Sequence, residues 1–228
     1  MNKINLKSIA LDGPSGAGKS TLAKKTAENF GFIYVDTGAL YRCIGLFAFQ
    51  NNIASKDKDG VVALLPQIKL EMRYDDNGVQ RMFLNSEDVT EAIRMPEISA
   101  YASDVSAMPE VRGFLLDMQR DMALKYDVIM DGRDIGTVVL PDAALKIFIT
   151  ADAVTRAKRR YLELSEKGVA TTFEEVKNAM IIRDKNDSER DTAPLKAAED
   201  AVVLDTTDLD FEESFKAICD LVSGRFGI

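Results

Sequence analysis

Short apolar runs separated by longer amphipathic stretches organise most of the chain. The runs are rich in Val, Ile and Phe and show no clean alternation, which is typical of strands covered on both faces. They lie at Leu6–Asp12, Phe32–Asp36, Asp127–Asp131, Leu145–Thr150 and Ala201–Asp205. Because helical patterns lie between them, we expect an α/β fold in three layers around a five-stranded parallel sheet.

Several of these runs end in an aspartate, at Asp12, Asp36, Asp131 and Asp205. The carboxyl ends of parallel strands meet at one edge of a sheet, and ligands of such sheets collect there. We therefore expect the functional side chains at this edge.

Residues 53–95 depart from this pattern. Apolar and charged side chains alternate between Ile68 and Tyr74, which indicates a half-buried antiparallel strand. Asp76-Asn77-Gly78 then predicts a hairpin turn with positive φ values at Asn-Gly, and a second strand follows at Gln80–Asn85. We expect a small antiparallel β subdomain inserted beside a substrate cleft.

Local signals also mark helix ends. Pro109 is placed to open a helix, and Asp152 and Thr172 are placed to cap two more. Thr172 and Glu175 have the spacing of a capping box, and Gly168 is placed to end the helix that Asp152 begins.

Composition narrows the class of protein. At 228 residues with a net charge of −8, the chain suits one buried core and disfavours a nucleic-acid partner. It has no histidine, and its two cysteines, Cys43 and Cys219, fall in apolar stretches where we expect reduced, buried thiols. No apolar run approaches the ~20 residues that span a bilayer. Residues 1–5 lack the pattern of a secretory leader, so we expect a cytoplasmic protein.

The most informative motif follows the first run. Residues 13–20 read Gly-Pro-Ser-Gly-Ala-Gly-Lys-Ser and fit the phosphate-binding pattern G-x-x-x-x-G-K-[ST], between a predicted strand and a predicted helix. Its glycines let backbone N–H groups point at phosphate oxygens, and the helix N-terminus adds the positive end of its dipole. We expect Lys19 to reach the β- and γ-phosphates of a nucleoside triphosphate and the Ser20 hydroxyl to ligate Mg²⁺.

Two further segments point to a second phosphate. Asp131 ends the one strand that resembles a Walker B strand, and Arg133 follows it closely, which is unusual for an ATPase. Arg42 follows another strand end and suits bidentate phosphate binding, whereas Thr37 has the alternative explanation of a helix cap. A guanine-reading Thr-Lys-x-Asp motif is absent from the sequence, which weighs against a GTPase.

Arginines also gather on two predicted helix faces. One face carries Arg156, Arg159 and Arg160, and the other carries Arg183, Asp187 and Arg190. Such arginines repel one another unless acidic residues or a bound anion lie among them, so pairing within each helix, through Glu163 and Asp187, is one explanation. The other is a lid that closes over a triphosphate, excludes water and stabilises the transferred phosphoryl group.

Taken together, the motifs resemble the cytidylate kinase family of nucleoside monophosphate kinases. The resemblance covers nearly the whole chain and is carried by residues 9–19, 36–42, 131–139 and 190–195, with Glu87-Asp88-Val89-Thr90 and Ile93-Arg94 in the insert. It implies an ATP-dependent phosphotransferase with a phosphate group as acceptor, which converts CMP and dCMP to CDP and dCDP with Mg²⁺ bound to ATP.

The resemblance also implies roles for individual residues. Catalysis would involve Lys19, Arg133, Arg156, Arg159 and Arg160. The ATP phosphates would be bound by Gly13, Pro14, Ser15, Gly16, Ala17, Gly18, Lys19, Ser20 and Thr21. The acceptor phosphate would be held by Arg42, Arg133 and Arg190, the cytosine edge by Ser103, Arg112 and Asp134, and the ribose by Arg183 and Asp187. Further substrate-binding residues would be Thr37, Tyr41 and Asp131, and Asp36 or Asp134 would orient the acceptor.

The expected organisation is one P-loop kinase unit. Its core would comprise residues 1–36, 97–150 and 191–228, with a monophosphate-binding region at 37–96 and a lid at 151–190. The resemblance implies a monomer with small-molecule partners, ATP and CMP or dCMP, and with neither nucleic acid nor membrane. Two alternatives are a P-loop kinase for UMP, AMP or an alcohol such as shikimate, and a regulatory switch that transfers nothing. The surplus of arginines favours the first interpretation.

Overall fold

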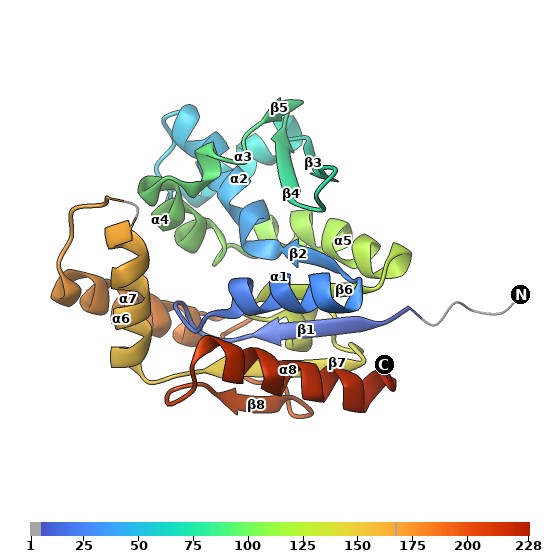
Figure 1. The fold of residues 1–228 in the computed structure, drawn as a ribbon. Helices are drawn as coiled ribbons and strands as arrows, with labels where there is room; N and C mark the ends of the chain where they lie inside the picture. The colour runs from blue at the N-terminus through green and yellow to red at the C-terminus, as the bar shows by residue number, and fades with distance from the viewer. Residues whose placement is uncertain (1–5, 167) are drawn as a thin grey trace, which may run out of the picture.

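The computed structural model describes residues 6–166 and 168–228 (Figure 1). Residues 1–5, which we examined for a secretory leader, lie outside the described residues. The central sheet contains β1 (Ser8–Asp12), β2 (Ile33–Asp36), β6 (Val128–Gly132), β7 (Leu145–Thr150) and β8 (Val202–Asp205). Its order is β2-β6-β1-β7-β8, and each neighbouring pair is parallel. The predicted α/β fold with a five-stranded parallel sheet is therefore confirmed.

The two faces of this sheet bury separate cores. Ile9 and Leu11 of β1 pack with α1 (Lys19–Phe30) and α8 (Phe211–Phe226), which lie together on one face (Figure 1). Ala10, between them, packs on the opposite face with η3 (Ile135–Val139) and α5 (Pro109–Lys125). Both faces of the strands are thus covered, which explains their continuous apolar runs.

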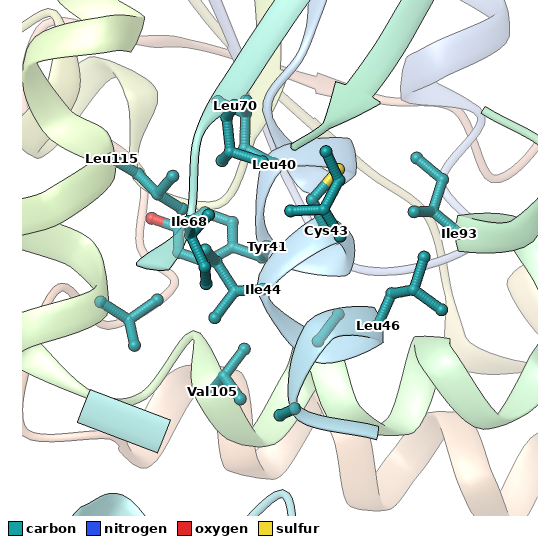
Figure 2. Packing of buried hydrophobic residues seen from close by; sticks show 14 of the residues in the cluster. Leu40, Tyr41, Cys43, Ile44, Leu46, Ile68, Leu70, Ile93, Val105 and Leu115 are labelled. Carbon is teal, nitrogen blue, oxygen red and sulfur yellow. The ribbon is translucent and has the colours of Figure 1, made fainter. Parts of the chain in front are cut away.

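A further hydrophobic cluster joins the insert to the core. Helix α2 (Thr37–Gln50) passes through it, and Leu40, Ile44 and Leu46 on this helix meet side chains from several other elements (Figure 2). Those partners include Ile68, Leu70, Ile93, Val105 and Leu115. The elements involved are α3 (Lys58–Leu64), η1 (Leu65–Gln67), β3 (Leu70–Tyr74), η2 (Ala92–Arg94), α4 (Pro96–Val105) and α5. The cluster therefore extends past residue 96, where the sequence places the end of the insert.

The inserted hairpin is antiparallel, as predicted, and differs in two details. Strands β3 and β4 (Gln80–Leu84) are joined by a third strand, β5 (Glu87–Asp88), which is too short to show in the sequence pattern. In the turn only Gly78 has a positive φ, of 73°. Asn77 keeps a negative φ because the Asp75 carboxylate accepts hydrogen bonds from the N–H groups of Asn77 and Val79 and closes the loop instead.

The remaining helices form a hairpin of α6 (Ala153–Glu166) and α7 (Phe173–Glu189) at one side of the molecule (Figure 1). Ala157, Val176 and Met180 form its small core. The predicted caps are confirmed, because Asp152 accepts from the N–H groups of Val154 and Thr155 and because Thr172 and Glu175 form a capping box. Pro109 is the first residue of α5, also as predicted.

The two thiols differ in exposure. Cys43 is fully buried in the cluster of Figure 2, whereas Cys219 is only partly buried, so its predicted burial is wrong. Cys219 follows Ile218, which points into the core, and the helical rotation between them carries the thiol to the rim of the packed face of α8. Across the residues that the structure describes, every helix is too short or too polar to pass through a bilayer.

Candidate active site

A cavity of about 590 Å³ opens at the carboxyl edge of the sheet, where the glycine-rich loop, the insert and the α6–α7 hairpin meet. Most of the residues singled out in the sequence line it. They are Ser15, Gly16, Gly18, Lys19, Ser20, Thr21, Thr37, Tyr41, Arg42, Ser103, Arg112, Asp131, Arg133, Asp134, Arg160, Arg183, Asp187 and Arg190. The fold thus brings segments from the whole length of the chain to one opening.

The glycine-rich loop has a backbone that side chains would not permit. Gly13 has φ of 148°, and a Cβ there would lie 1.9 Å from the carbonyl oxygen of Ile149. Gly18, with φ of 84°, directly precedes α1 and has no side chain to cap it. The first N–H groups of α1 are therefore directed toward the loop without a side-chain cap, which favours an anion.

Lys19 is a cation held out of water at this helix start. It is 5% exposed, and its Nζ donates to the carbonyl oxygen of Pro14 at 2.7 Å. Burial lowers the pKa of Lys19 well below its ordinary value, and the nearby Arg133 acts in the same direction, against the carboxylates of Asp131 and Asp12. A bound anion would restore the preference for the charged ammonium.

Asp131, Ser20 and Tyr34 form a linked group beside Lys19. The Ser20 hydroxyl donates to Oδ2 of Asp131 at 2.7 Å, and the Tyr34 hydroxyl donates to Oδ1 at 2.8 Å. Burial raises the pKa of Asp131, and the nearby carboxylate of Asp36 adds to this effect. A buried carboxylate with a raised pKa, next to a hydroxyl, offers oxygen ligands of the kind that a hard divalent cation prefers. Among the described residues no cluster of three or more acidic, histidine or cysteine side chains could hold such a cation alone, so its other ligands would be phosphate or water oxygens.

At the far end of the cavity, Arg112 and Asp134 form a buried ion pair. Arg112 also donates to the carbonyl oxygen of Ser106 at 3.1 Å, and its guanidinium lies 5.5 Å from the centroid of the Tyr41 ring. Ser103 lines the same end. Paired donors and acceptors beside an aromatic ring can bind the edge and the face of a heterocyclic base.

Two further arginines of the cavity keep buried donors unused, and one of them, Arg190, lies with its Nη2 3.6 Å from Oδ1 of Asp134. In the described part of the chain, Nε of Arg183 and Nη2 of Arg190 are buried and have no hydrogen-bond partner. Burial and the nearby Arg133 lower the pKa of Arg183 to about 10. Each unsatisfied buried donor costs roughly 1–3 kcal/mol, more for a charged group, which an anion in the cavity would recover.

The arginines of helix α6 point to different parts of the structure, although they were expected to share one face. Arg160 lines the cavity and pairs with Glu163 at 2.7 Å. Arg156 does not line this cavity, because its guanidinium pairs with Asp184 at 2.5 Å and donates to the carbonyl oxygen of Ser15 at 3.0 Å. The inward face of α6 at this position is filled by the glycine-rich loop itself.

Arg159 also points away from the main cavity. Its Nη2 donates to the carbonyl oxygens of Thr206 and Leu209, at 2.7 and 3.2 Å, and so crosses to the loop before α8. In this structure Arg156 and Arg159 do not line the main cavity, and their contact with the phosphates stays a prediction. Both residues are tied to backbone carbonyls of loops that border the cavities.

Asp187 pairs with a partner distant in sequence. Its Oδ2 lies 2.9 Å from Nε of Arg133. Within α7, the Asp187 carboxylate also favours the charged form of Arg183, so screening within the helix and the pair with Arg133 are both present. Pairing within α6 describes Arg160 and Glu163.

A second, smaller cavity of about 380 Å³ adjoins the glycine-rich loop. Ala17, Leu22, Arg159, Leu209 and Phe211 are among its lining residues. Its walls are mostly apolar, and it shares Gly16, Gly18, Thr21, Arg160 and Glu163 with the main cavity. Gly13 and Pro14, which the sequence also predicts to bind phosphate, line neither cavity.

Sequence reasoning assigned no role to Arg94, which the insert brings into the main cavity together with Glu91. Arg94 Nη2 lies 2.9 Å from Oδ2 of Asp36, and Arg42 Nη1 lies 3.7 Å from the same oxygen. These guanidinium groups lower the pKa of Asp36 against its burial. The Ile93-Arg94 motif was visible in the sequence, but nothing there shows that this arginine crosses from the insert to the end of β2.

Comparisons with known proteins agree with this geometry. The sequence model of the family described as cytidylate kinase matches residues 9–224. A cytidylate kinase of Caldicellulosiruptor bescii is 50% identical over 221 residues, which cover 97% of this chain and 96% of that protein. A cytidylate kinase of Lactobacillus gasseri is 45% identical over 220 residues, which cover 96% and 95%.

Solved structures are more distant. The crystal structure of an uncharacterized protein from Eubacterium ventriosum aligns with a TM-score of 0.55 at 16% identity. The alignment covers 97% of this chain and 100% of the other. At this identity the likeness concerns the fold.

Proposed function

The chain belongs to the cytidylate kinase family, and we propose that it transfers the γ-phosphoryl group of ATP to the phosphate of CMP or dCMP. The observation that carries this proposal is the layout of one cavity. The cavity combines a phosphate-binding loop, a buried Arg112–Asp134 pair, and two arginines, Arg183 and Arg190, that keep buried donors unused. Such a cavity suits two phosphorylated ligands placed end to end.

ATP occupies the loop end in this proposal. The N–H groups of the glycine-rich loop and of the first turn of α1 bind its phosphates, and Lys19 contacts the β- and γ-phosphates. The adjoining apolar cavity beside Phe211 takes the adenine ring. Arg156 and Arg159 support this end through the carbonyl groups that they hold.

The monophosphate occupies the other end. Arg42, Arg133 and Arg190 hold its phosphate, while Arg112, Asp134 and Ser103 bind the cytosine edge and Tyr41 packs beside the ring. Arg183 and Asp187 contact the ribose. Thr37 lines the cavity as the first residue of α2, whose N-cap is Asp36. Its hydroxyl donates to the carbonyl oxygen of Asp131 at 2.8 Å and thereby fixes the start of α2 beside the acceptor.

Transfer depends on position and charge. The acceptor phosphate is already anionic near neutral pH, so it attacks without a strong general base. Lys19, Arg133 and Arg160 supply positive charge around the transferred group, and closure of the α6–α7 hairpin excludes water as a competing acceptor.

We further infer that Mg²⁺ accompanies ATP. Ser20 and Asp131 would hold it, because the Ser20 hydroxyl and Oδ2 of Asp131 lie 2.7 Å apart beside the glycine-rich loop. Bound there, the ion would neutralise charge on the β- and γ-phosphates. We also propose that the protein is a cytoplasmic monomer that acts on small molecules.

The test is an ADP-release assay with ATP and Mg²⁺ and each nucleoside monophosphate in turn. We expect the highest kcat/KM with CMP and dCMP, because the Arg112–Asp134 pair is placed to bind cytosine. Faster turnover with AMP or GMP contradicts the cytosine assignment. ADP release that is independent of any monophosphate contradicts the transfer reaction itself.

A further inference from the structure

Tyr34 is a buried phenol at the metal end of the site that neither the sequence motifs nor the cavity lining identifies. It lies in β2 and is 8% exposed. Its hydroxyl donates to Oδ1 of Asp131 at 2.8 Å, while Oδ2 of the same carboxylate accepts from Ser20 at 2.7 Å. Each oxygen of Asp131 therefore has a different hydroxyl partner.

The position of Tyr34 is fixed from several sides. Strands β2 and β6 pair in parallel, with Asp36 opposite Asp131, so Tyr34 and the aspartate lie on adjacent strands near the same edge. The carbonyl oxygen of Tyr34 accepts from the hydroxyl of Tyr74 in the insert at 2.9 Å. Lys24 Nζ lies 5.6 Å from the centroid of its ring. A ring held in this way directs its hydroxyl at one place only.

We propose that Tyr34 is a positioning residue for the metal site, which holds Oδ1 of Asp131 so that Oδ2 faces the cation shared with Ser20. The inference rests on the proposed function, which assigns a divalent cation to Ser20 and Asp131. Tyr34 itself does not touch the cation or the substrates and acts through the carboxylate.

The chemistry favours a phenol for this task. A carboxylate has two equivalent oxygens and can rotate, so a metal site gains from a donor that engages one of them. A lysine or arginine in this place would neutralise the charge that attracts the cation. The neutral Tyr34 hydroxyl fixes the orientation of Asp131 and leaves its full negative charge for the metal.

The test measures metal binding directly, with Mn²⁺ as the probe in the presence of ADP, by electron paramagnetic resonance of free Mn²⁺. Tyr34→Phe is expected to weaken Mn²⁺ binding about tenfold, the lower end of the loss typical for a residue that orients a metal ligand. Tyr126→Phe is the control, because it removes a phenolic hydroxyl from an exposed side chain outside both cavities. We expect it to bind Mn²⁺ like the wild-type protein.

Two non-natural residues separate this role from a general role in folding. 4-Fluorophenylalanine at position 34 fills the volume without a donor and should bind Mn²⁺ as weakly as Tyr34→Phe, whereas 4-aminophenylalanine offers an N–H donor and should restore binding. Wild-type affinity in the fluorinated or Phe variant, whatever its melting temperature, overturns the inference. Absence of ADP-dependent Mn²⁺ binding in the wild-type protein instead contradicts the metal assignment in the proposed function.

Discussion

Single charged residues that are removed from water dominate the chemistry of this protein. Lys19, Asp131 and Arg112 are each less than a tenth exposed. Charges in such places cost several kcal/mol unless they are paired or hydrogen bonded. Arg112 has its partner in Asp134, whereas Arg183 and Arg190 keep buried donors unused. The unused donors are the strongest sign, at this scale, that anions complete the site.

Lys19 provides the simplest test at this scale. Lys19→Ala should lower kcat by roughly 10²–10³-fold, because it removes a preorganised donor to the developing charge. Steady-state ADP release at saturating ATP and CMP measures the effect. Lys216→Ala, an exposed lysine of α8 outside both cavities, is the control and should stay close to wild type. A loss below tenfold for Lys19→Ala would show that this ammonium does not bind the transferred group.

Asp187 has two roles in this account, which a comparison of CMP with dCMP as substrates can separate. It holds Arg133 at 2.9 Å and is proposed to contact the ribose. Asp187→Asn should therefore reduce kcat/KM for both substrates through Arg133, and reduce it further for CMP, since only CMP carries a 2′-hydroxyl. Comparison of CMP and dCMP in the same assay measures the difference. Equal losses would leave Asp187 as a support for Arg133 alone.

The buried carboxylate of Asp12 should make the stability of the folded protein depend on pH. Its carboxylate is buried and accepts from the N–H groups of Ile135 at 2.8 Å and Gly136 at 2.7 Å. Burial raises its pKa from 3.8 to about 6 despite these bonds. Asp12 therefore binds a proton more strongly in the folded state than in the unfolded state. Its contribution to the free energy of unfolding is present below pH 4 and is lost as the pH rises through 6.

Urea unfolding of wild type and Asp12→Asn at several pH values measures this effect. The free energy of unfolding of wild type relative to the variant should fall by up to about 3 kcal/mol between pH 4 and pH 7. Both proteins share the other titrating groups, so the contribution of these groups drops out of the difference between wild type and variant. A difference that stays constant over this range would mean that Asp12 has an ordinary pKa in the folded protein.

At the scale of elements, helix α7 matters because it carries Arg183 and Asp187 into the cavity. Its own small core with α6 is limited to a few side chains, including Val176 and Met180. The capping box of Thr172 and Glu175 therefore contributes a large share of its local stability.

Thr172→Ala tests this dependence. It should cost about 1 kcal/mol of local stability, which corresponds to roughly fivefold faster amide exchange in α7. Asp210→Ala removes the equivalent cap from α8 and is the matched control, because α8 packs on the central sheet. The control should lower the melting temperature and leave exchange in α7 unchanged. Unaltered exchange in α7 of Thr172→Ala would show that tertiary contacts alone hold this helix.

The elements were also the most predictable part of the molecule. Residues 145–150 form a strand with the predicted bounds, because β7 is covered on both faces and is apolar apart from Lys146 and the terminal Thr150. Thr172 and Glu175 were recognised because a capping box is local in sequence. Strand β5 was missed because two exposed residues, Glu87 and Asp88, leave no periodic signal.

The site was predictable as a set of residues but not as a set of contacts. The motif around Lys19 and the Asp131–Asp134 segment identify a phosphate site because each is local. Helical spacing placed Arg156 and Arg160 together, yet it could not show that Asp184 and the Ser15 carbonyl occupy Arg156. The Tyr34–Asp131 and Arg94–Asp36 contacts join residues far apart in sequence and depend on how the insert and β2 pack.

At the scale of the whole molecule, the fold brings three regions to one opening. The sheet and the segments after its strands supply the phosphate-binding loop and Asp134, the insert and the adjoining helices α4 and α5 supply Arg94, Ser103 and Arg112, and the α6–α7 hairpin supplies Arg160 and Arg183. The protein carries a net charge of −8, so its cationic groups are concentrated where they serve the cavity. This distribution favours small anionic ligands over extended polyanions.

The most direct measurement of the central claim is a crystal structure with adenosine and cytidine joined through a pentaphosphate chain. The account predicts adenine beside Phe211, cytosine at Arg112 and Asp134, and a phosphate chain in contact with Lys19, Arg42, Arg133 and Arg190. A complex in which the chain lies elsewhere and these side chains make no contact with phosphate would contradict it.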